Sequence, residues 1–515
     1  MEAKRFPTAC VASPHYLASA TGLAVLASGG NALDAAIATN LTLGVVTPYL
    51  CGYGGDLFAL VWKDGAPFAY NGSGRAPAAA TLDAVRRAAG SDRMPTFGPH
   101  SVTVPGVIEA WFALLERFGT LWFGDLVRQA RRYAHEGFVL TAQAEASFAR
   151  ARERFADSPD WMAVYGQARA GEPLRQSGLA RTIDMLSTDG PDAYYRGQIG
   201  HAIVDHVRSM GGLLAEDDLA EHRGEWVEPM AVRYRGVDVL ELPPNTQGVA
   251  VLEALRIIEA LGELPPDGPD RHHLLIESLK LALADRDAYV TDPFEMKISA
   301  EELIADPWIS ERARDIDSRR AAEPAPGRAA VGGTAYICAA DSDGMCVSLI
   351  QSNWMGIGAG LIVPDWGINL HNRGAYFSLD PDHANVIAPR KRTLHTLVPA
   401  MALRDGRPWL TFGSMGGDGQ AQTHVQLLAR IVDDHEDLQR AVAAPRWVIS
   451  PEDWAVQIES RFDPAWIDDL RSRGHRISWA GELDPVMGHA HAITLEDNGY
   501  AGASDPRAEG AVLGL

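Results

Sequence analysis

Cysteine is scarce in this sequence. The 515 residues contain four cysteines, Cys10, Cys51, Cys338 and Cys346, and no two of them have the CxxC spacing of redox or metal motifs. Four scattered thiols are too few for the disulfide framework that holds many small secreted folds together. We therefore expect four buried, free thiols.

Long hydrophobic runs are also missing. No stretch reaches the 18 apolar residues that a membrane-spanning helix needs. Pro7, Pro14 and His15 interrupt the N-terminal segment, which therefore lacks the apolar core of a secretory signal. The sequence predicts a cytoplasmic protein that has no membrane as a partner.

Positive charge is in deficit, with 46 Lys and Arg against 67 Asp and Glu and a formal net charge of -21. This balance argues against nucleic acid and anionic membranes as partners, because both are negatively charged. It still allows a local basic pocket for an anionic small molecule, built from a few placed arginines. A length of 515 residues predicts two or three domains, or one large two-lobed unit.

The common catalytic motifs are absent as well. The sequence has no HExxH, no GxSxG, no GxxxxGKS or GxxxxGKT, and no zinc-like Cys/His spacing. His201, His206 and the His272-His273 pair have no carboxylate or cysteine partner at metal-binding spacing, and packing or surface roles explain them most simply. These absences exclude the usual hydrolase and NTPase classes.

The hydrophobic pattern alternates between helical and strand periods. It predicts helices within residues 33–45, 108–146, 248–290, 421–432 and 464–473, and strands at 58–62 and in short segments after residue 334. Residues 318–333 are rich in Pro, Gly, Ala and Arg, a composition typical of a flexible linker. The pattern indicates a layered α+β fold that this linker divides into two parts.

A hairpin follows the linker directly. Two β-rich runs, 336–340 and 347–351, flank an Asp-Ser-Asp-Gly turn, and Thr334 stands where the linker meets the first run. High β-propensity is the ordinary reason for a threonine there. A threonine with a free amino group can, however, act as nucleophile and base in one residue. That role requires cleavage after Gly333, whose backbone freedom can expose its carbonyl to the Thr334 hydroxyl.

Residues 411–434 predict a strand, a glycine-rich turn and an amphipathic helix. The turn region contains Gly413, Gly416, Gly417 and Gly419. Backbone N–H groups of such a turn can converge at a helix N-terminus and stabilise a phosphate or a developing oxyanion. A tight turn without chemistry is an equally good interpretation. No lysine follows the glycines, which argues against a nucleotide.

Two arginines lie in loops of small residues. Arg75 belongs to the stretch NGSGRAPAAAT (71–81), and Arg373 belongs to LHNRGAYFS (370–378). The rigid fork of a guanidinium group suits a carboxylate or an oxalate-like pair of oxygens. Ordinary ion pairing at the surface is the alternative for each arginine.

Taken in order, these motifs resemble the γ-glutamyltransferase family of N-terminal nucleophile hydrolases. The matching stretches, which run through nearly the whole chain, are SGGNALDAAIA (28–38), GYGGDLF (52–58), VPGVIEAW (104–111), PPNTQGVA (243–250), the Thr334 hairpin, GSMGGDGQ (413–420) and YAGASDPR (500–507). The resemblance implies a four-layer αββα sandwich and self-cleavage before Thr334 into segments 1–333 and 334–515. It also implies amide chemistry through an acyl-enzyme, with no metal and no organic cofactor.

The resemblance assigns catalytic roles by position. Thr334 becomes the nucleophile, and its new amine becomes the general base. Ser352 falls where the family has a hydroxyl that hydrogen-bonds the nucleophile. Gly416 and Gly417 fall on the glycines of the oxyanion hole.

The substrate-binding positions depart from the family pattern. His395 and Thr396 occupy the place of a serine pair that holds the substrate carboxylate. Where γ-glutamyl enzymes bind the substrate ammonium with an acidic pair, this chain has Ala375 and Tyr376. Truncating one partner of a buried charge pair typically costs about 2 to 5 kcal/mol, so glutamyl groups should be disfavoured.

Positive charge takes the place of the acidic pair. The resemblance gives Arg75 the role of the family arginine, which lies in a differently spaced motif, and Arg373 adds charge beside Tyr376. The segments IQSNWMGIGAG (350–360) and LHNRGAYFSLDP (370–381) are similar to the branch that includes oxamate amidohydrolase. We therefore predict hydrolysis of an amide with a compact anionic acyl group such as oxalyl.

Two alternatives remain open at this point. One is true γ-glutamyl transfer to water, peptides or amines. The other is a non-catalytic homologue that serves as a binding or assembly protein. In the enzyme interpretation the two processed segments stay associated, and a homodimer is compatible with the sequence.

Overall fold

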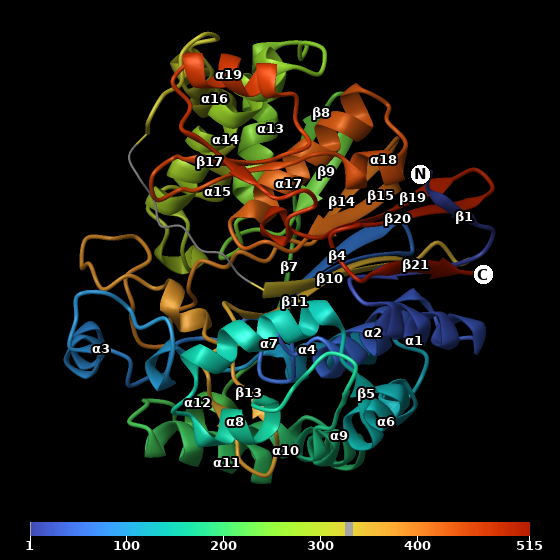
Figure 1. Cartoon of the computed structure of the whole chain (residues 1–515), viewed down its shortest axis with the longest axis vertical. Helices are drawn as coiled ribbons and strands as arrows, with labels where there is room; N and C mark the ends of the chain where they lie inside the picture. The colour runs from blue at the N-terminus through green and yellow to red at the C-terminus, as the bar shows by residue number, and fades with distance from the viewer. Residues whose placement is uncertain (1, 325–332) are drawn as a thin grey trace.

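Two seven-stranded antiparallel sheets form the centre of the structure, a computed structural model that describes residues 2–324 and 333–515 (Figure 1). The first sheet contains β2 (Cys10–Ser13), β3 (Asp56–Lys63), β4 (Ala66–Asn71), β7 (Glu225–Val227), β10 (Gly333–Ala340), β11 (Cys346–Trp354) and β21 (Ala511–Gly514). Its strand order is β21-β2-β10-β11-β3-β4-β7. This one sheet therefore contains both strands that precede the predicted linker and strands that follow it.

The second sheet lies against the first. It contains β1 (Lys4–Phe6), β8 (Met230–Tyr234), β9 (Val237–Glu241), β14 (Ala400–Arg404), β15 (Arg407–Ser414), β19 (Ala490–Glu496) and β20 (Gly499–Ser504). Its order is β1-β20-β19-β15-β14-β9-β8.

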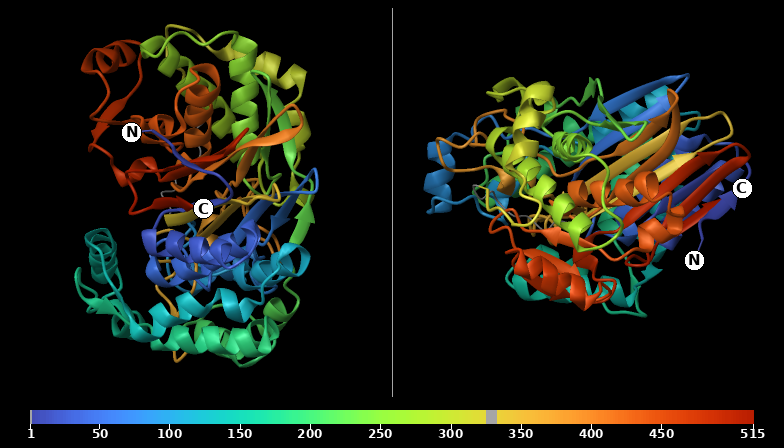
Figure 2. Two further views of the ribbon diagram at one scale, coloured as in Figure 1. Left: turned by 90° about the vertical axis from the view of Figure 1, so that its right-hand side faces the viewer. Right: turned by 90° about the horizontal axis from the view of Figure 1, so that it is seen from above.

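Helices cover the outer face of each sheet (Figures 1 and 2). The first sheet is covered by α1 (Tyr16–Ala27), α2 (Ala32–Val46) and α4 (Val107–Phe118), with α6 (Arg128–Glu136) and α9 (Ser177–Asp189) beyond them. The second sheet is covered by α13 (Gly248–Leu261), α14 (Pro269–Tyr289) and α17 (Gly419–Leu428).

The side chains of β3 show how the layers are held together. Phe58 and Leu60 join a buried cluster that includes Leu240 and Ile493 of the second sheet, while Leu57 joins the cluster beneath the N-terminal helices. Successive side chains of a strand point to opposite faces, so a strand that is apolar throughout packs on both sides. The two sheets and their helices form the four-layer αββα sandwich that the sequence predicts.

Smaller elements complete the chain. The remaining helices are α3 (Leu82–Ala89), α5 (Phe123–Leu126), α7 (Ala142–Arg154), α8 (Pro159–Tyr165), α10 (Asp192–Tyr195), α11 (Gln198–Ser209), α12 (Glu216–Ala220), α15 (Ala300–Leu303), α16 (Asp306–Asp315), α18 (Leu438–Ala443) and α19 (Pro464–Ser472). The remaining strands are β5 (Phe138–Val139), β6 (Pro173–Leu174), β12 (Ile362–Val363), β13 (Ile368–Asn369), β16 (Trp447–Ile449), β17 (Val456–Glu459) and β18 (Ile477–Ala480). The last three form a separate sheet, in the order β16-β17-β18.

The predicted hairpin of β10 and β11 is confirmed, and Asp341 explains its turn. The Oδ1 atom of Asp341 accepts hydrogen bonds from the amides of Asp343 (3.0 Å) and Met345 (3.2 Å). Its Oδ2 atom accepts one from the amide of Ala32, the first residue of α2, at 2.7 Å. Gly344 has φ 77°, which glycine adopts without the steric cost of a Cβ atom. One side chain thus closes the hairpin and fixes it against the helix layer.

The cysteines are buried and free, as predicted. Burial raises the pKa of Cys51 to about 12, so this thiol stays protonated and unreactive. Within the described part of the chain, no helix is long and apolar enough to cross a membrane. Of the predicted linker, residues 325–332 lie outside the described residues.

Candidate active site

Thr334 lies at an irregularity in the pairing of β10 with β11. Gly333 pairs with Trp354 but Ala335 pairs with Gln351, so one strand has one residue more than the other between these pairs. Such a bulge re-aims a side chain out of the regular alternation. The Thr334 side chain is buried, and hydrogen bonds with Ser352 and Gln420 hold its hydroxyl.

Ser352 connects the Thr334 hydroxyl with the preceding carbonyl. Thr334 Oγ1 donates to Ser352 Oγ at 3.3 Å, and Ser352 Oγ donates to the Gly333 carbonyl oxygen at 2.5 Å. The Trp354 amide donates to Ser352 Oγ at 2.7 Å and holds that hydroxyl in place. Gln420 Nε2 approaches Thr334 Oγ1 from α17 at 3.4 Å. The hydroxyl and carbonyl that would react in self-cleavage are therefore joined through one serine.

The glycine turn between β15 and α17 lies beside this hydroxyl, because Gln420 belongs to the first turn of α17. Gly416 has φ 137° and Gly417 has φ 60°, values that residues with a Cβ atom rarely adopt. Neither amide donates a hydrogen bond to another residue of the described chain. Two free N–H groups on a constrained turn are what an oxyanion hole requires.

A buried network supports the turn from behind. Gln247, directly before α13, donates from Nε2 to the carbonyl oxygens of Gly417 (3.0 Å) and Thr396 (2.8 Å). Arg286 of α14 donates from Nη1 to Gln247 Oε1 (2.6 Å) and to Asp418 Oδ1 (2.7 Å). The arginine fixes the orientation of the amide, and the amide connects the glycine turn to Thr396.

Arg373 is buried with part of its charge uncompensated. Its Nη1 atom donates to Thr396 Oγ1 at 3.2 Å, and its guanidinium lies 5.1 Å from the centre of the Trp354 ring. Its Nη2 atom is buried and has no hydrogen-bond partner in residues 2–324 and 333–515. Burial lowers the pKa of Arg373 to about 9, because desolvation penalises the cation. A buried guanidinium with an unused donor is suited to bind an anion.

His395 supports the site indirectly, because both of its ring nitrogens contact protein groups. Its Nε2 atom lies 3.2 Å from Asp56 Oδ2, and its Nδ1 atom accepts a hydrogen bond from the Leu397 amide at 3.4 Å. Burial and nearby Arg373 lower the pKa of His395 to about 3, so the ring is neutral. Both ring nitrogens are occupied, and Thr396 is the member of the predicted pair whose side chain reaches Arg373.

Asp56 is buried beneath His395 and is also approached by His371, whose Nδ1 lies 3.4 Å from Asp56 Oδ2. The amides of Gly74 and Gly106 donate to its Oδ1 atom at 3.1 and 3.2 Å. Burial alone would raise the pKa of Asp56, but the two histidines and these amides favour the carboxylate, and its pKa lies well below the usual range. Asp56 thus joins four segments of the chain around the site.

Tyr376 and Ala375 are the two residues that the resemblance places where the family has its acidic pair. The Tyr376 hydroxyl donates to Asp418 Oδ1 at 2.8 Å, and its ring packs edge-on against Trp354 with 5.5 Å between centroids. Ala375 is buried and packs in the apolar cluster beneath the second sheet. The carboxylate of Asp418 is close by, but it is paired with buried Arg286.

Known proteins resemble this chain over its whole length. The family profile described as Gamma-glutamyltranspeptidase matches residues 18–515. This chain belongs to that family. The Glutathione hydrolase-like YwrD proenzyme of Bacillus subtilis is 38% identical over 519 residues, covering 98% of both chains. The Oxamate amidohydrolase proenzyme of Klebsiella pneumoniae is 36% identical over 520 residues, covering 98% of this chain and 97% of the relative.

A solved structure agrees with the sequence comparison. The crystal structure of cephalosporin acylase from Bacillus halodurans superposes with a TM-score of 0.96 at 37% identity, covering 100% of this chain and 97% of that one. The gamma-glutamyltranspeptidase relatives are named as hydrolase, amidohydrolase and acylase enzymes, several as proenzymes. The predicted family, fold and enzyme class are confirmed, and the chain is an N-terminal nucleophile hydrolase.

Arg75 does not join the Thr334 cluster in this gamma-glutamyltranspeptidase family member. Its guanidinium pairs with Asp292 (3.1 Å) and Glu225 (3.0 Å) and also donates to the Arg390 carbonyl oxygen at 3.1 Å. It lines a different cavity, of about 310 Å³, in which no residue of the Thr334 cluster takes part. The ion-pair alternative describes Arg75, and its predicted role in substrate binding finds no support in these contacts.

Several supporting residues escaped the sequence-based prediction. Gln247 and Asp418 lie inside two of the quoted family stretches, PPNTQGVA and GSMGGDGQ, and Asp56 lies inside GYGGDLF. The sequence signal for these three residues was a polar side chain within an apolar or glycine-rich stretch. Arg286 lies in the last turn of α14, and nothing in its local sequence distinguishes it from a surface arginine.

Gln247 offers a direct test of the network in this member of the gamma-glutamyltranspeptidase family. In Gln247→Leu the carbonyls of Gly417 and Thr396 lose their donor, so the glycine turn is no longer held. We expect kcat on the preferred amide to fall by about ten- to a hundred-fold, with a smaller change in KM. Gln247→Glu, which keeps an acceptor for Arg286 but removes both donors, should show the same fall in kcat. An unchanged kcat in both variants would contradict the supporting role.

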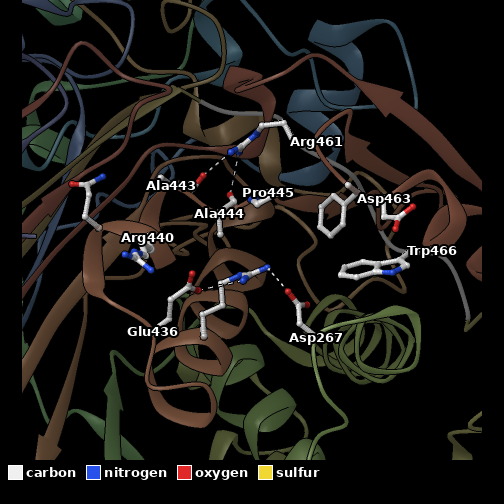
Figure 3. Close-up of a pocket in the computed structure, with 12 residues that line it drawn as sticks. Asp267, Glu436, Arg440, Ala443, Ala444, Pro445, Arg461, Asp463 and Trp466 are labelled. Carbon is white, nitrogen blue, oxygen red and sulfur yellow. Dashed lines mark hydrogen bonds and ion pairs between the residues drawn. The ribbon is translucent and has the colours of Figure 1, made fainter. Parts of the chain in front are cut away.

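A separate cavity of about 500 Å³ lies away from this cluster (Figure 3). Two of its arginines face protein acceptors: Arg430 lies between Asp267 and Glu436, while Arg461 donates to the carbonyls of Ala443 and Ala444. No residue of the Thr334 cluster lines it. Its size alone therefore gives it no part in the chemistry.

His273 has a carboxylate nearby after all, which corrects the sequence-based expectation. Its Nδ1 atom lies 2.8 Å from His475 Nε2, and Glu277 completes a buried group whose donor atoms lie within 4.8 Å of one another. Glu277 already accepts from Lys280 Nζ at 2.8 Å, and His273 Nε2 donates to the Asp317 carbonyl oxygen at 2.7 Å. A metal ion here would compete with the lysine, so these contacts explain the group as packing.

Proposed function

We propose that this chain is an autoprocessed threonine amidohydrolase that acts on amides of a small anionic acyl group, such as oxalyl. The observation that carries the proposal is the buried Arg373, whose Nη2 atom has no partner in the described chain. Arg373 is connected to the glycine turn through Thr396 and Gln247. An anionic acyl group bound there would lie beside the candidate oxyanion hole.

Processing would begin with the Thr334 hydroxyl. Its Oγ1 atom attacks the Gly333 carbonyl carbon while Ser352 Oγ hydrogen-bonds the carbonyl oxygen. The C–N bond to Thr334 breaks, the nitrogen takes the hydroxyl proton, and an ester links Gly333 to Thr334 Oγ1. Water then hydrolyses the ester, leaving a carboxylate on Gly333 and a free amine on Thr334.

Catalysis would repeat the same chemistry on a substrate. The Thr334 amine takes the proton as Oγ1 attacks the amide carbon, and the N–H groups of Gly416 and Gly417 stabilise the oxyanion. The C–N bond breaks, and the leaving amine takes that proton. Water then attacks the acyl-enzyme ester, with the Thr334 amine as base, and releases the acid.

The arrangement of strands supports continued association of segments 1–333 and 334–515. In the first sheet, β10 and β11 lie between β2 and β3, so strands after the predicted cleavage point pair on both sides with strands before it. Separating the segments would break these ladders and expose the apolar clusters on both faces. We propose that the active enzyme contains both segments, acts on a small molecule in the cytoplasm and needs no metal or organic cofactor.

True γ-glutamyl transfer is the competing function, since one relative is named a glutathione hydrolase-like proenzyme. A glutamyl group carries an α-ammonium that needs a carboxylate. Asp418 is the acid nearest to the Tyr376 hydroxyl, and Arg286 already neutralises it. The uncompensated charge at this site is therefore positive, which favours a compact anion over an ammonium.

The test compares two substrates and one arginine variant. We expect release of ammonia from oxamate to exceed release of the aniline from a γ-glutamyl anilide. In Arg373→Leu, kcat/KM for oxamate should fall by roughly 10- to 100-fold, because a hydrogen bond to a charged group contributes about 1.5 to 3 kcal/mol. Cleavage at Thr334 should persist.

Arg404→Leu is the matched control. Arg404 is exposed and stacks on Trp409 at 3.8 Å from the ring centre, so its loss should leave oxamate hydrolysis unchanged. A clear preference for the γ-glutamyl anilide would overturn the proposed substrate class and favour γ-glutamyl transfer.

A further inference from the structure

A groove of about 320 Å³ opens beside the glycine turn, and Gln247 is not among the described residues that line it. One wall is the turn itself, and the other is the three-stranded sheet β16-β17-β18. Its volume is at the small end of the roughly 300 to 1,000 Å³ typical of ligand sites. The turn side contributes Gly416, Asp418 and Gly419, and the opposite wall comes from the small sheet and its loops.

The register of the small sheet explains the shape of this wall. Val448 pairs with Gln457, and Gln457 pairs with Ser478, so these three side chains form a row across one face of the sheet. A Cβ atom at Gly419 would lie 3.3 Å from Val448 Cγ2, which shows that the glycine turn and the row are in direct contact at one end. The row carries no charge, and Gly416 lines the same groove.

The charge of the groove is one-sided. Among the described residues that line it are two aspartates and no lysine, arginine or histidine; Asp418 is paired with Arg286, so the negative charge of the groove comes from Asp453. Ser450 and the Ala455 amide hydrogen-bond Asp453 and lower its pKa, so this exposed carboxylate stays ionised. The arginine-bearing side of the glycine turn and the groove therefore have opposite electrostatic preferences.

We propose that the groove binds the amine half of the amide substrate, and that this half is a neutral or cationic group with apolar carbon atoms. The inference rests on the proposed function, because it takes Gly416 and Gly417 as the oxyanion hole. The Gly417 carbonyl oxygen accepts a hydrogen bond from Gln247, which also donates to Thr396, on the side proposed for the anionic acyl half. Gly416 lines the groove. A carbonyl carbon held at the turn would direct its nitrogen substituent into the groove.

This assignment makes a secondary amide the natural substrate class, with the primary amide oxamate as its smallest member. Val448, Ile449, Pro451 and Val486 offer apolar contacts to an alkyl or aryl substituent. A carboxylate on the amine half would approach Asp453 and be repelled. The groove therefore selects against amides of amino acids with free carboxylates.

A series of oxalyl amides tests the proposal at constant leaving-group chemistry. The amines are methylamine, butylamine, 1,3-diaminopropane and β-alanine, which all leave as simple alkyl amines. We expect kcat/KM for N-butyloxamate and for the cationic aminopropyl amide to exceed that for N-methyloxamate by about ten-fold or more. The anionic β-alanine amide should be hydrolysed several-fold more slowly than N-methyloxamate, and Asp453→Asn should reduce that deficit.

Variants of the wall separate the groove from the reaction centre. Val448→Trp should fill the groove and abolish the advantage of the butyl over the methyl amide while N-methyloxamate is still hydrolysed. Trp479→Tyr is the matched control, because Trp479 is the neighbour of Ser478 on β18, is 42% exposed and does not line the groove. It should change neither rate.

The outcomes distinguish this inference from the proposed function. If only γ-glutamyl amides are hydrolysed, the oxalyl assignment fails, and the same four amines on a γ-glutamyl group test the groove. Equal rates for methyl and butyl amides in whichever series is cleaved, insensitive to Val448→Trp, would overturn the groove assignment while leaving the acyl assignment intact. Hydrolysis of neither series would overturn both.

Discussion

Thr334→Ala should remain a single 515-residue chain and show no amide hydrolysis. The variant lacks the hydroxyl that is hydrogen-bonded to Ser352 next to the Gly333 carbonyl, so no group is left at that point to attack it. Without cleavage, residue 334 also has no free amine to act as base. Losing a nucleophile typically costs a factor on the order of 10⁴ or more, and here the base is lost with it.

The measurement is a denaturing gel with intact mass and N-terminal sequencing. The unaltered chain should give two pieces, the smaller beginning at Thr334, while the alanine variant gives one. Thr334→Ser keeps a hydroxyl and should still be cleaved, though more slowly. Ser352→Ala removes the hydrogen bond to the Gly333 carbonyl and should slow cleavage without preventing folding. Cleavage of Thr334→Ala at the same bond would refute the mechanism.

The parts of the site that could be predicted from the sequence lie within short stretches of chain. Thr334 and Ser352 belong to two strands of one hairpin, whose turn residues fix which strands pair. Gly416 and Gly417 are adjacent, and a run of glycines between a strand and a helix is itself a signal. In these cases local sequence determines the local geometry.

Contacts between distant segments could not be predicted in this way. Arg286 and Asp418 are 132 residues apart, and Gln247 reaches Gly417 across 170. Arg75 shows the same limit, because loop composition marks an arginine as a carboxylate ligand without showing whether the carboxylate belongs to a substrate or to the protein. In this structure Arg75 pairs with two carboxylates of the protein, those of Asp292 and Glu225.

The fold shows a similar division. Helices follow from their hydrophobic period: α2 begins and ends close to the predicted 33–45, and α13 and α14 together fill the predicted 248–290. The order of strands does not follow from any local period, because β10 pairs with β2 more than 300 residues earlier, for example Cys338 with Ala12. That pairing is selected by burial on both faces of the sheet, which involves the whole chain.

Arg507→Met should strongly destabilise the protein. Arg507 lies in the YAGASDPR stretch, and its side chain is buried. It donates to both oxygens of Glu459 (2.7 and 2.8 Å), to Asp505 Oδ1 (3.0 Å) and to the Ala444 carbonyl oxygen (2.7 Å). Removing one partner of a buried ion pair typically costs about 3 to 5 kcal/mol, because the remaining charge stays desolvated. Denaturant and thermal unfolding of the purified chain would measure the loss.

Arg5→Met is the matched control. Arg5 also pairs with a carboxylate, Glu496 at 3.0 Å, but its side chain is 60% exposed, so its loss should cost less than about 1 kcal/mol. A double variant, Arg507→Met with Glu459→Gln, should recover part of the lost stability because it removes a buried charge. Equal effects of the two arginine variants would show that burial does not determine the cost.

The same network should connect stability to processing. Asp505, held by Arg507, accepts from Arg446 at 2.7 Å, and Arg446 donates to the Gly488 carbonyl oxygen at 3.3 Å. The Gly488 Cα atom lies 3.5 Å from where a Cβ atom of Gly416 would stand. Arg507→Met should therefore weaken the packing against the glycine turn and slow self-cleavage. Arg5→Met should be cleaved at the normal rate. Normal cleavage in the destabilised Arg507→Met chain would show that the turn is positioned by Gln247 and Arg286 alone.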